Sequence, residues 1–322
     1  MKVGIMGAGT IAIKMANTIN KMEDVTCYAI ASRSLEKAEA FKAEYGFEVA
    51  YGSYEELAKD ENVDLIYIAT PHSEHHKNAI MAMNYGRNIL CEKAFAVNAK
   101  EAREMIEVAR EKKVYLAEAI WTRYMPYREI VEQLIKEDKI GEIISVSGNL
   151  GYSLMNIERN VRPELAGGAL LDIGVYPINF ASIFLGNDIE SVVSTCVKME
   201  TGVDETNAII LKYKSGQLAV LSSTFRGGSD QQGIIYGTKG YIIVRELNNP
   251  VGVEIYNNQG ELIEKVPLPK KISGYEYEVI EAARAIKEGR LECPQAPHDI
   301  TIKIMELMDS IRKEWGIKYP FE

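Results

Sequence analysis

The sequence has few cysteines, and none stands in a metal-binding or disulfide pattern. The chain of 322 residues contains only Cys27, Cys91, Cys196 and Cys293, far apart and without a Cys-x-x-Cys pair. Neither a zinc site nor a disulfide framework is indicated by such spacing. We expect structural free thiols, as in a reducing compartment, and no metal.

An excess of positive charge is also missing. The net charge is −9 and no basic stripe is present, which argues against nucleic acid or an anionic membrane as a partner. The predicted first strand begins at Lys2, leaving no room for a signal peptide, and no apolar run approaches roughly 18 residues. We therefore expect a cytoplasmic protein. A chain of this length exceeds what one core usually fills, so two domains are expected.

A glycine turn follows the first apolar run of the chain. Residues 3–6 suit a buried parallel strand, and a helical pattern starts at Thr10. This is the context that a Gly-x-Gly-x-x-Ala fingerprint requires. Gly7 permits a tight turn, Gly9 leaves room for a pyrophosphate, and Ala12 lets the helix pack closely. The start of the helix would face the anion, so we predict dinucleotide contacts at Gly7, Gly9, Thr10 and Ile11. The alternative is a turn that only connects strand to helix.

The end of the second predicted strand, residues 25–31, favours NADP. NAD-preferring folds place an acidic residue there for the ribose hydroxyl, whereas this chain has Ser32 and Arg33. A guanidinium attracts a 2′-phosphate that an acid would repel. We predict that Ser32, Arg33 and Lys37 bind NADP, with NAD possible. Alternatively, Arg33 is a solvated loop residue and cofactor choice is loose.

Four more strands are expected at 49–51, 64–69, 88–91 and 114–119, separated by helical patterns. Six strands with five crossovers make a complete, doubly wound parallel sheet that ends near residue 120. We therefore predict an α/β class, with a dinucleotide-binding Rossmann domain over residues 1–120.

Polar residues stand where the predicted strand 64–69 ends. Ligands bind at this edge of such sheets, so Thr70, Pro71, His72 and His75 are candidates for cofactor contacts. One of the two histidines would touch the nicotinamide side. The alternative is that both are helix-entry residues satisfied by backbone groups. Two histidines without a third ligand do not make a metal site.

Glu92 and Lys93 follow the next strand at the same edge. Lysine is rarely buried without a partner, and its ammonium readily polarises or protonates a carbonyl oxygen. We take Lys93 as a candidate catalytic residue and Glu92 as a candidate cofactor contact.

The pattern changes after residue 126, where period-two strand candidates replace the alternation of strands and helices. Such runs lie at 143–150, 189–200, 205–213, 218–225, 233–236, 240–245 and 251–256. They predict an α+β domain over 121–322 with a large, open, mostly antiparallel sheet. One face of that sheet needs a cover, which a partner subunit usually supplies.

Four segments carry a resemblance to a known family: GAGTIA at 7–12, TPHSEHH at 70–76, CEKAFAVNAKEA at 91–102 and AEAIWTRYMP at 117–126. With them, the chain resembles the glucose–fructose oxidoreductase / inositol dehydrogenase / rhizopine-catabolism (Gfo/Idh/MocA) family, most of all its dimeric dihydrodiol dehydrogenase branch. The resemblance implies an NAD(P)-dependent oxidoreductase that forms homodimers through the second-domain sheet. One departure is Ala94, which stands where the family's Glu-Lys-Pro motif has proline.

The segment 167–177, GGALLDIGVYP, contains the candidate catalytic residues of the second domain. Its helical pattern over 169–185 puts Asp172 and Tyr176 on one face. Tyr176 stands where the wider family has a histidine read as the acid/base group. A phenol is a poor acid near pH 7 unless a cation lowers its pKa, and Lys93 is the candidate cation. We predict Lys93, Asp172 and Tyr176 as the catalytic set; the alternative for Tyr176 is a hydroxyl at the domain interface.

Aromatic and basic residues supply candidate substrate contacts, with interdomain packing or salt bridges as the alternative for each. They are Trp121, Arg123, Tyr124, Tyr152 and Arg162. The predicted reaction is hydride transfer to or from a secondary alcohol or ketone of a small cyclic polyol, sugar or dihydrodiol. Two alternatives remain: a net isomerisation or glycoside cleavage with recycled cofactor, and a non-catalytic NADP sensor.

Overall fold

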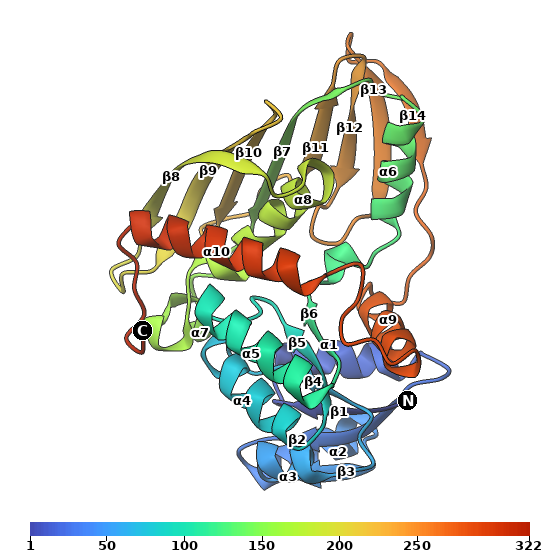
Figure 1. The fold of residues 1–322 in the computed structure, drawn as a ribbon, viewed down its shortest axis with the longest axis vertical. Coiled ribbons are helices and arrows are strands. Elements are labelled where there is room, and N and C mark those ends of the chain that lie inside the picture. Colours follow the sequence, from blue (N-terminus) through green and yellow to red (C-terminus); the bar gives the residue numbers. More distant parts are fainter. The chain divides into compact units, whose positions relative to one another are not determined.

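The structure is a computed structural model that describes all 322 residues. The chain forms two compact units (Figure 1). The first comprises Met1–Trp121 and Lys271–Met305, and the second Thr122–Lys270 and Glu306–Glu322. The prediction of one continuous domain over 121–322 did not include this return of 271–305 to the first unit.

Hydrogen bonds across the sequence explain that return. His298 Nε2 lies 2.8 Å from the Leu116 carbonyl oxygen, and Thr301 Oγ1 donates to Glu118 at 3.1 Å. Leu116 in turn donates its N–H to the Leu291 carbonyl at 3.0 Å. Because these partners stand about 180 residues apart, no local pattern announces them.

The first unit is built on a six-stranded parallel sheet in the order β3-β2-β1-β4-β5-β6. Its strands are β1 (Lys2–Met6), β2 (Thr26–Ala31), β3 (Val49–Tyr51), β4 (Leu65–Ile68), β5 (Asn88–Glu92) and β6 (Leu116–Ala119). Its helices are α1 (Thr10–Ile19), α2 (Leu35–Tyr45), α3 (Tyr54–Lys59), α4 (His72–Asn84), α5 (Ala99–Lys112), α9 (Glu276–Lys287) and the first part of α10 (His298–Glu314). The strands are short and apolar because helices cover both faces of the sheet. The predicted doubly wound sheet is confirmed.

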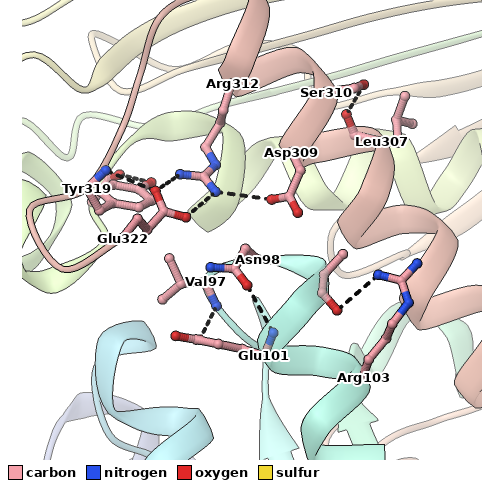
Figure 2. Close-up of polar contacts among 12 residues, drawn as sticks. Val97, Asn98, Glu101, Arg103, Leu307, Asp309, Ser310, Arg312, Tyr319 and Glu322 are labelled. Carbon is pink, nitrogen blue, oxygen red and sulfur yellow. Dashed lines mark hydrogen bonds and ion pairs between the residues drawn. The ribbon is translucent and has the colours of Figure 1, made fainter.

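Side chains cap the first turns of several of these helices. Ser34 accepts a hydrogen bond from the Lys37 N–H at the start of α2, and Ser53 caps α3 in the same way. At α5, Asn98 accepts the Glu101 N–H at 2.9 Å while the Glu101 carboxylate accepts the Val97 N–H (Figure 2). Such reciprocal bonds satisfy N–H groups that the first turn of a helix leaves open.

The second unit is built on an eight-stranded sheet in the order β14-β13-β12-β11-β7-β10-β9-β8. Its strands are β7 (Ile143–Gly151), β8 (Ile189–Lys198), β9 (Asp204–Tyr213), β10 (Leu218–Thr224), β11 (Gly233–Gly237), β12 (Gly240–Arg245), β13 (Gly252–Asn257) and β14 (Leu262–Val266). Only β7 and β10 pair in parallel, so the predicted mostly antiparallel sheet is confirmed. The edge strand β14 was not predicted, because its residues LIEKV are exposed and do not alternate clearly.

Helices cover one face of this sheet. They are α6 (Tyr127–Lys136), a π-helical turn (Leu170–Gly174), α8 (Val175–Leu185) and the second part of α10. The short α7 (Glu158–Val161) also belongs to this unit. In Figure 1, α8 lies against this face, where it contacts β7 and β10. The π-helical turn replaces the first part of the α-helix predicted over 169–185.

The stretch Pro163–Leu185 is the one helical segment long and apolar enough, with a mean hydropathy of 1.5, to cross a membrane by length and composition alone. Asp172 interrupts this stretch, so it is not the continuous apolar run of about 18 residues whose absence the sequence predicts. However, 83% of the stretch is buried inside the protein, as in the core helix of a folded domain.

The opposite face of the eight-stranded sheet is exposed and partly apolar. Val193 of β8 pairs with Ile210 of β9, which pairs with Val220 of β10, and these side chains are 65%, 43% and 51% exposed. Their immediate neighbours along each strand, such as Ile209 and Leu221, point to the opposite face, which the helices cover, and are buried there.

Candidate active site

The glycine turn after β1 has the backbone geometry that its sequence predicts. Gly7 has φ of +101°, and a Cβ there would lie 2.7 Å from the Ala69 carbonyl oxygen. Gly9 is exposed, and a Cβ added to it would meet nothing within 4 Å. Gly9 is also the N-cap of α1 and makes no side-chain cap bond. The N–H groups of the first turn therefore remain available to an anion, and the turn fits the pyrophosphate of a dinucleotide.

Residues after β2 present charge next to this turn. Arg33 and Lys37 are exposed, whereas Ser32 is buried and accepts a weak hydrogen bond from the Ser34 N–H at 3.4 Å. Arg33 also lies near Tyr54: burial raises the pKa of that phenol, and the guanidinium partly counters the rise. The two cations thus stand at the position that the ribose fingerprint marks.

The residues after β4 are mostly buried. His75 is fully buried, with Nδ1 and Nε2 each 2.9 Å from a backbone carbonyl oxygen, of Ala94 and Thr70 respectively. Burial lowers the pKa of His75 to about 4, so the ring is neutral near pH 7 and donates to only one of these carbonyls. His75 ties the strand-end loop of β4 to that of β5, which is the backbone-satisfied arrangement that the sequence left open as its alternative.

Glu92 and Lys93 end β5 within a network of buried polar groups. The Glu92 carboxylate accepts hydrogen bonds from the Tyr67 hydroxyl and, at 3.1 Å, from the Lys93 N–H. The Lys93 side chain is half-buried, and the Lys93–Ala94 peptide is cis. These contacts fix the backbone that carries the lysine.

A further acid of the first unit, Glu278, was not anticipated. It is fully buried, neither carboxylate oxygen has a hydrogen-bond partner, and burial followed by repulsion from Glu92 raises its pKa well above the ordinary range. A neutral carboxyl group is the form consistent with this environment. The sequence offers no sign of it, because Glu278 occupies an ordinary helical position in α9.

In the second unit, Asp172 lies in the π-helical turn and Tyr176 in the first turn of α8, and both are buried. π-Helical turns are frequent at functional sites. Asp172 forms a two-pronged ion pair with Arg159, at 3.0 Å for the closer pair of atoms. The sequence did not predict Arg159 as the partner of Asp172, because a basic residue 13 positions from an acid belongs to no helical or strand period.

The predicted lining residues have differing environments. Trp121 stacks on Tyr275 with ring centroids 4.2 Å apart. Arg123 is buried and donates to Asn179 and Ser182 of α8, while Arg162 is exposed and paired with Glu158 and Glu164. The Tyr124 ring is buried, and the Tyr152 hydroxyl bonds Gln231 and Asn248. Arg123 and Arg162 thus hold salt-bridge or packing positions. No cluster of three metal-ligating side chains occurs.

Two family models match the chain. Residues 1–119 match the Gfo/Idh/MocA oxidoreductase family model with its NAD-binding Rossmann fold, and residues 129–243 match the family's C-terminal domain. The chain belongs to the Gfo/Idh/MocA oxidoreductase family. The predicted family, enzyme class and NAD(P) cofactor are thereby confirmed.

Named relatives span the full chain. A trans-1,2-dihydrobenzene-1,2-diol dehydrogenase of Xenopus tropicalis is 36% identical over 99% of both chains. A D-xylose 1-dehydrogenase (NADP(+)) of Hypocrea jecorina is 34% identical over 99% of this chain and 93% of its own. Among solved structures, KijD10, a 3-ketoreductase from Actinomadura kijaniata in complex with NADP, aligns with a TM-score of 0.84 at 25% identity and 97% coverage of both chains.

Proposed function

We propose that this oxidoreductase uses NADP to interconvert a secondary alcohol and a ketone on a small cyclic polyol, sugar or dihydrodiol. The observation that carries the proposal is the π-helical turn, which places a buried, ion-paired Asp172 four residues before a buried Tyr176. The named functions of the full-length relatives, a dihydrodiol dehydrogenase and a xylose dehydrogenase, support this substrate class.

Each catalytic residue has a distinct part in the proposed chemistry. A bound nicotinamide gives or takes the hydride. The Lys93 ammonium polarises the substrate oxygen, and the Tyr176 hydroxyl gives that oxygen a proton or takes it away. Asp172, held by Arg159, orients this pair and balances its charge. The proposal requires Lys93 and Tyr176 to act on the same oxygen.

The preference for NADP rests on charge. Arg33 and Lys37 are exposed cations beyond β2, and no acidic side chain occupies the ribose position. A guanidinium binds phosphate through paired hydrogen bonds, so a 2′-phosphate gains contacts that a ribose hydroxyl does not. The D-xylose relative is named as an NADP(+) enzyme, which agrees with this preference.

We also propose that two copies pair through the exposed face of the eight-stranded sheet. Val193, Ile210 and Val220 form an apolar row on it, and stacked Tyr241 and Tyr256, with centroids 5.0 Å apart, lie farther along. Exposed apolar patches of this kind mark interfaces. If the proposal holds, a V193K/V220K variant should sediment as a monomer while the wild type sediments as a dimer. A variant that still sediments as a dimer would contradict the proposal.

The function is tested with one absorbance assay. Purified protein is incubated with NADP⁺ or NAD⁺ and a panel of dihydrodiols, inositols, pentoses and hexoses, and reduced cofactor is measured. The proposal predicts stoichiometric NADPH formation with at least one member of the panel. Product formation without net NADPH would instead identify a reaction with recycled cofactor, and binding without turnover would identify a sensor.

A further inference from the structure

Four residues near the end of the chain form an ionic cluster around a buried arginine, here called the Arg312 cluster: Asp309, Arg312, Tyr319 and Glu322. The Arg312 guanidinium is 5% exposed and bonds both oxygens of Glu322 at 2.9 Å and Asp309 at 3.1 Å (Figure 2). It also lies 4.6 Å from the centre of the Tyr319 ring. Tyr319 donates its N–H to Glu322 at 3.0 Å, so the cluster fixes both backbone and ring of this tyrosine.

The tyrosine of this cluster reaches the segment that carries Asp172 and Tyr176. Its hydroxyl, on a ring that is 2% exposed, donates to the Gly167 carbonyl oxygen at 2.7 Å. Gly167 directly precedes Gly168 and the π-helical turn. A backbone position in the candidate catalytic segment is therefore fixed by a side chain that stands 152 residues later in the chain.

A second tie holds the other side of the same turn. Asp204 of β9 is 2% exposed and accepts the Leu170 N–H at 2.8 Å. Asn207 donates to the same Asp204 oxygen at 2.8 Å and accepts from Ser223 at 3.0 Å. This second tie thus anchors the first residue of the π-helical turn to the sheet beneath it.

Between the two ties, the backbone has little freedom to move sideways. Gly168 has φ of +116°, and a Cβ there would lie 2.5 Å from Asp204 Oδ1. A Cβ on Gly167 would lie 2.6 Å from the Asn160 carbonyl oxygen. The glycine pair allows the chain to pass closely between its anchors, but glycine itself favours no single conformation. The N–H groups of Gly167 and Gly168 also donate to backbone carbonyl oxygens, at 3.0 and 2.9 Å. The conformation of this turn is therefore set by its hydrogen bonds, and the two ties are the ones that come from distant parts of the chain.

We propose that the Arg312 cluster is a positioning element for catalysis: through the Tyr319 hydroxyl it sets the Gly167–Gly168 turn, and with Asp204 it fixes where the π-helical turn holds Asp172 and Tyr176. The residues of the cluster are positioning residues, since no role in contacting substrate is assigned to them. The part of this inference that concerns turnover rests on the proposed function.

The decisive variant is Tyr319→Phe, which keeps the buried ring over Arg312 and removes only the hydroxyl. Tyr213→Phe is the matched control, because Tyr213 is also buried, 1% exposed, and stands at the opposite end of β9 from Asp204. Two quantities are measured in each: kcat with the best substrate of the panel alongside Kd for NADP⁺, and amide hydrogen exchange over residues 168–176.

The proposal predicts that Tyr319→Phe lowers kcat about tenfold, with an unchanged Kd for NADP⁺, since small displacements of reacting groups cost much of the rate. Exchange over 168–176 should accelerate in this variant and stay at the wild-type rate in Tyr213→Phe. A Glu322→Gln variant, which weakens the ion pair with Arg312, should move both quantities in the same direction by a smaller factor.

Wild-type exchange over 168–176 in Tyr319→Phe would overturn the proposal, as would an equal acceleration in Tyr213→Phe. A wild-type kcat despite faster exchange would also overturn it. If the wild-type protein turns over no substrate at all, the proposed function fails alone, because the exchange measurement still decides whether the cluster sets this turn.

Discussion

The proposed catalytic residues fall into two sets, a lysine half in the first unit and a tyrosine half in the second, and the two sets are held in different ways. In the first unit, Lys93 follows directly from β5, and the contacts that fix it come from the sheet edge: Glu92 beside it, Tyr67 on the adjacent strand, and His75 in the first turn of α4. In the second unit, Tyr176 follows a π-helical turn whose anchors, Asp204 and Tyr319, lie at least 34 residues away in sequence.

The difference shows which of the two halves depends on distant parts of the fold for its position. Strand ends in a parallel sheet are placed by the ladder itself, so the lysine half needs few special contacts. The π-helical turn has local backbone bonds, such as that from the Gly168 N–H to the Asn160 carbonyl at 2.9 Å, but it also depends on the distant side chains Asp204 and Tyr319. We therefore expect the tyrosine half to respond to substitutions far from it, and the lysine half to respond mainly to substitutions within it.

Replacing the lysine should have the largest effect. We expect Lys93→Met to lower kcat by about a thousandfold, near 4 kcal/mol, because it removes the cation that stabilises the developing charge on the substrate oxygen. The Kd for NADP⁺ should change little. Steady-state kinetics and cofactor titration measure both, with Lys100→Met, an 86% exposed lysine of α5, as control. Retained turnover would remove Lys93 from the mechanism.

Removing the phenol should have a somewhat smaller effect. Tyr176→Phe is expected to lower kcat about a hundredfold, as for loss of a positioned proton donor. The Tyr213→Phe control should remain near the wild-type rate. If Tyr176→Phe turns over normally, a water or another side chain moves the proton, and the comparison of the two halves loses its chemical meaning.

His75 of the first unit and Asp204 of the second should affect the pH dependence of stability with opposite signs. His75 has a folded pKa of about 4 against 6.5, so the stability that its neutral form contributes is lost as pH falls below 6.5. Burial raises the pKa of Asp204 from 3.8 to about 6, so its contribution is present at low pH and is lost as pH rises through 6.

When the pH is lowered from 7 to 5, we expect His75 to decrease the free energy of unfolding by about 2 kcal/mol and Asp204 to increase it by about 1 kcal/mol. Denaturant unfolding of wild type, His75→Gln and Asp204→Asn at both pH values measures this. The free energy of unfolding of His75→Gln should depend less on acid than that of wild type, and that of Asp204→Asn should depend more on it. Equal slopes in all three proteins would contradict the assignment.

The smallest of these effects concerns the cofactor. Arg33→Asp should weaken NADPH and improve NADH, changing their ratio of kcat/KM by at least about tenfold, because the carboxylate repels a 2′-phosphate. Lys42→Asp makes the same charge change within α2, away from the end of β2, and should leave the ratio unchanged. An unaltered ranking in Arg33→Asp would show that Arg33 does not select the cofactor.

Much of the first unit could be predicted from local patterns. Apolar runs marked each of its six strands, and the residues that cap α2, α3 and α5 are serine and asparagine, types that favour this position. The glycine turn was recognisable because Gly7 and Gly9 have backbone reasons for their identity. The exposed strand β14, by contrast, has no such pattern, and it was missed.

Within the candidate site, residue types were easier to predict than their partners. Lys93, Asp172 and Tyr176 stood out by position in their motifs, and the ion pair of Asp172 with Arg159 did not. The same is true of His75. Its place after a strand suggested a contact with the cofactor, whereas the structure holds its ring between two backbone carbonyl oxygens, where it connects two loops.

The sequence by itself determined the class of fold, the dinucleotide turn and the family, because each depends on periodicity or on residues close together in the chain. Only the tertiary structure decided that residues 271–305 complete the first unit and that a π-helical turn replaces part of a regular helix. It also decided that Tyr319 and Asp204 hold this turn. The physical reason is separation: these contacts join residues from 34 to more than 150 positions apart, and only the folded chain brings them within hydrogen-bonding distance.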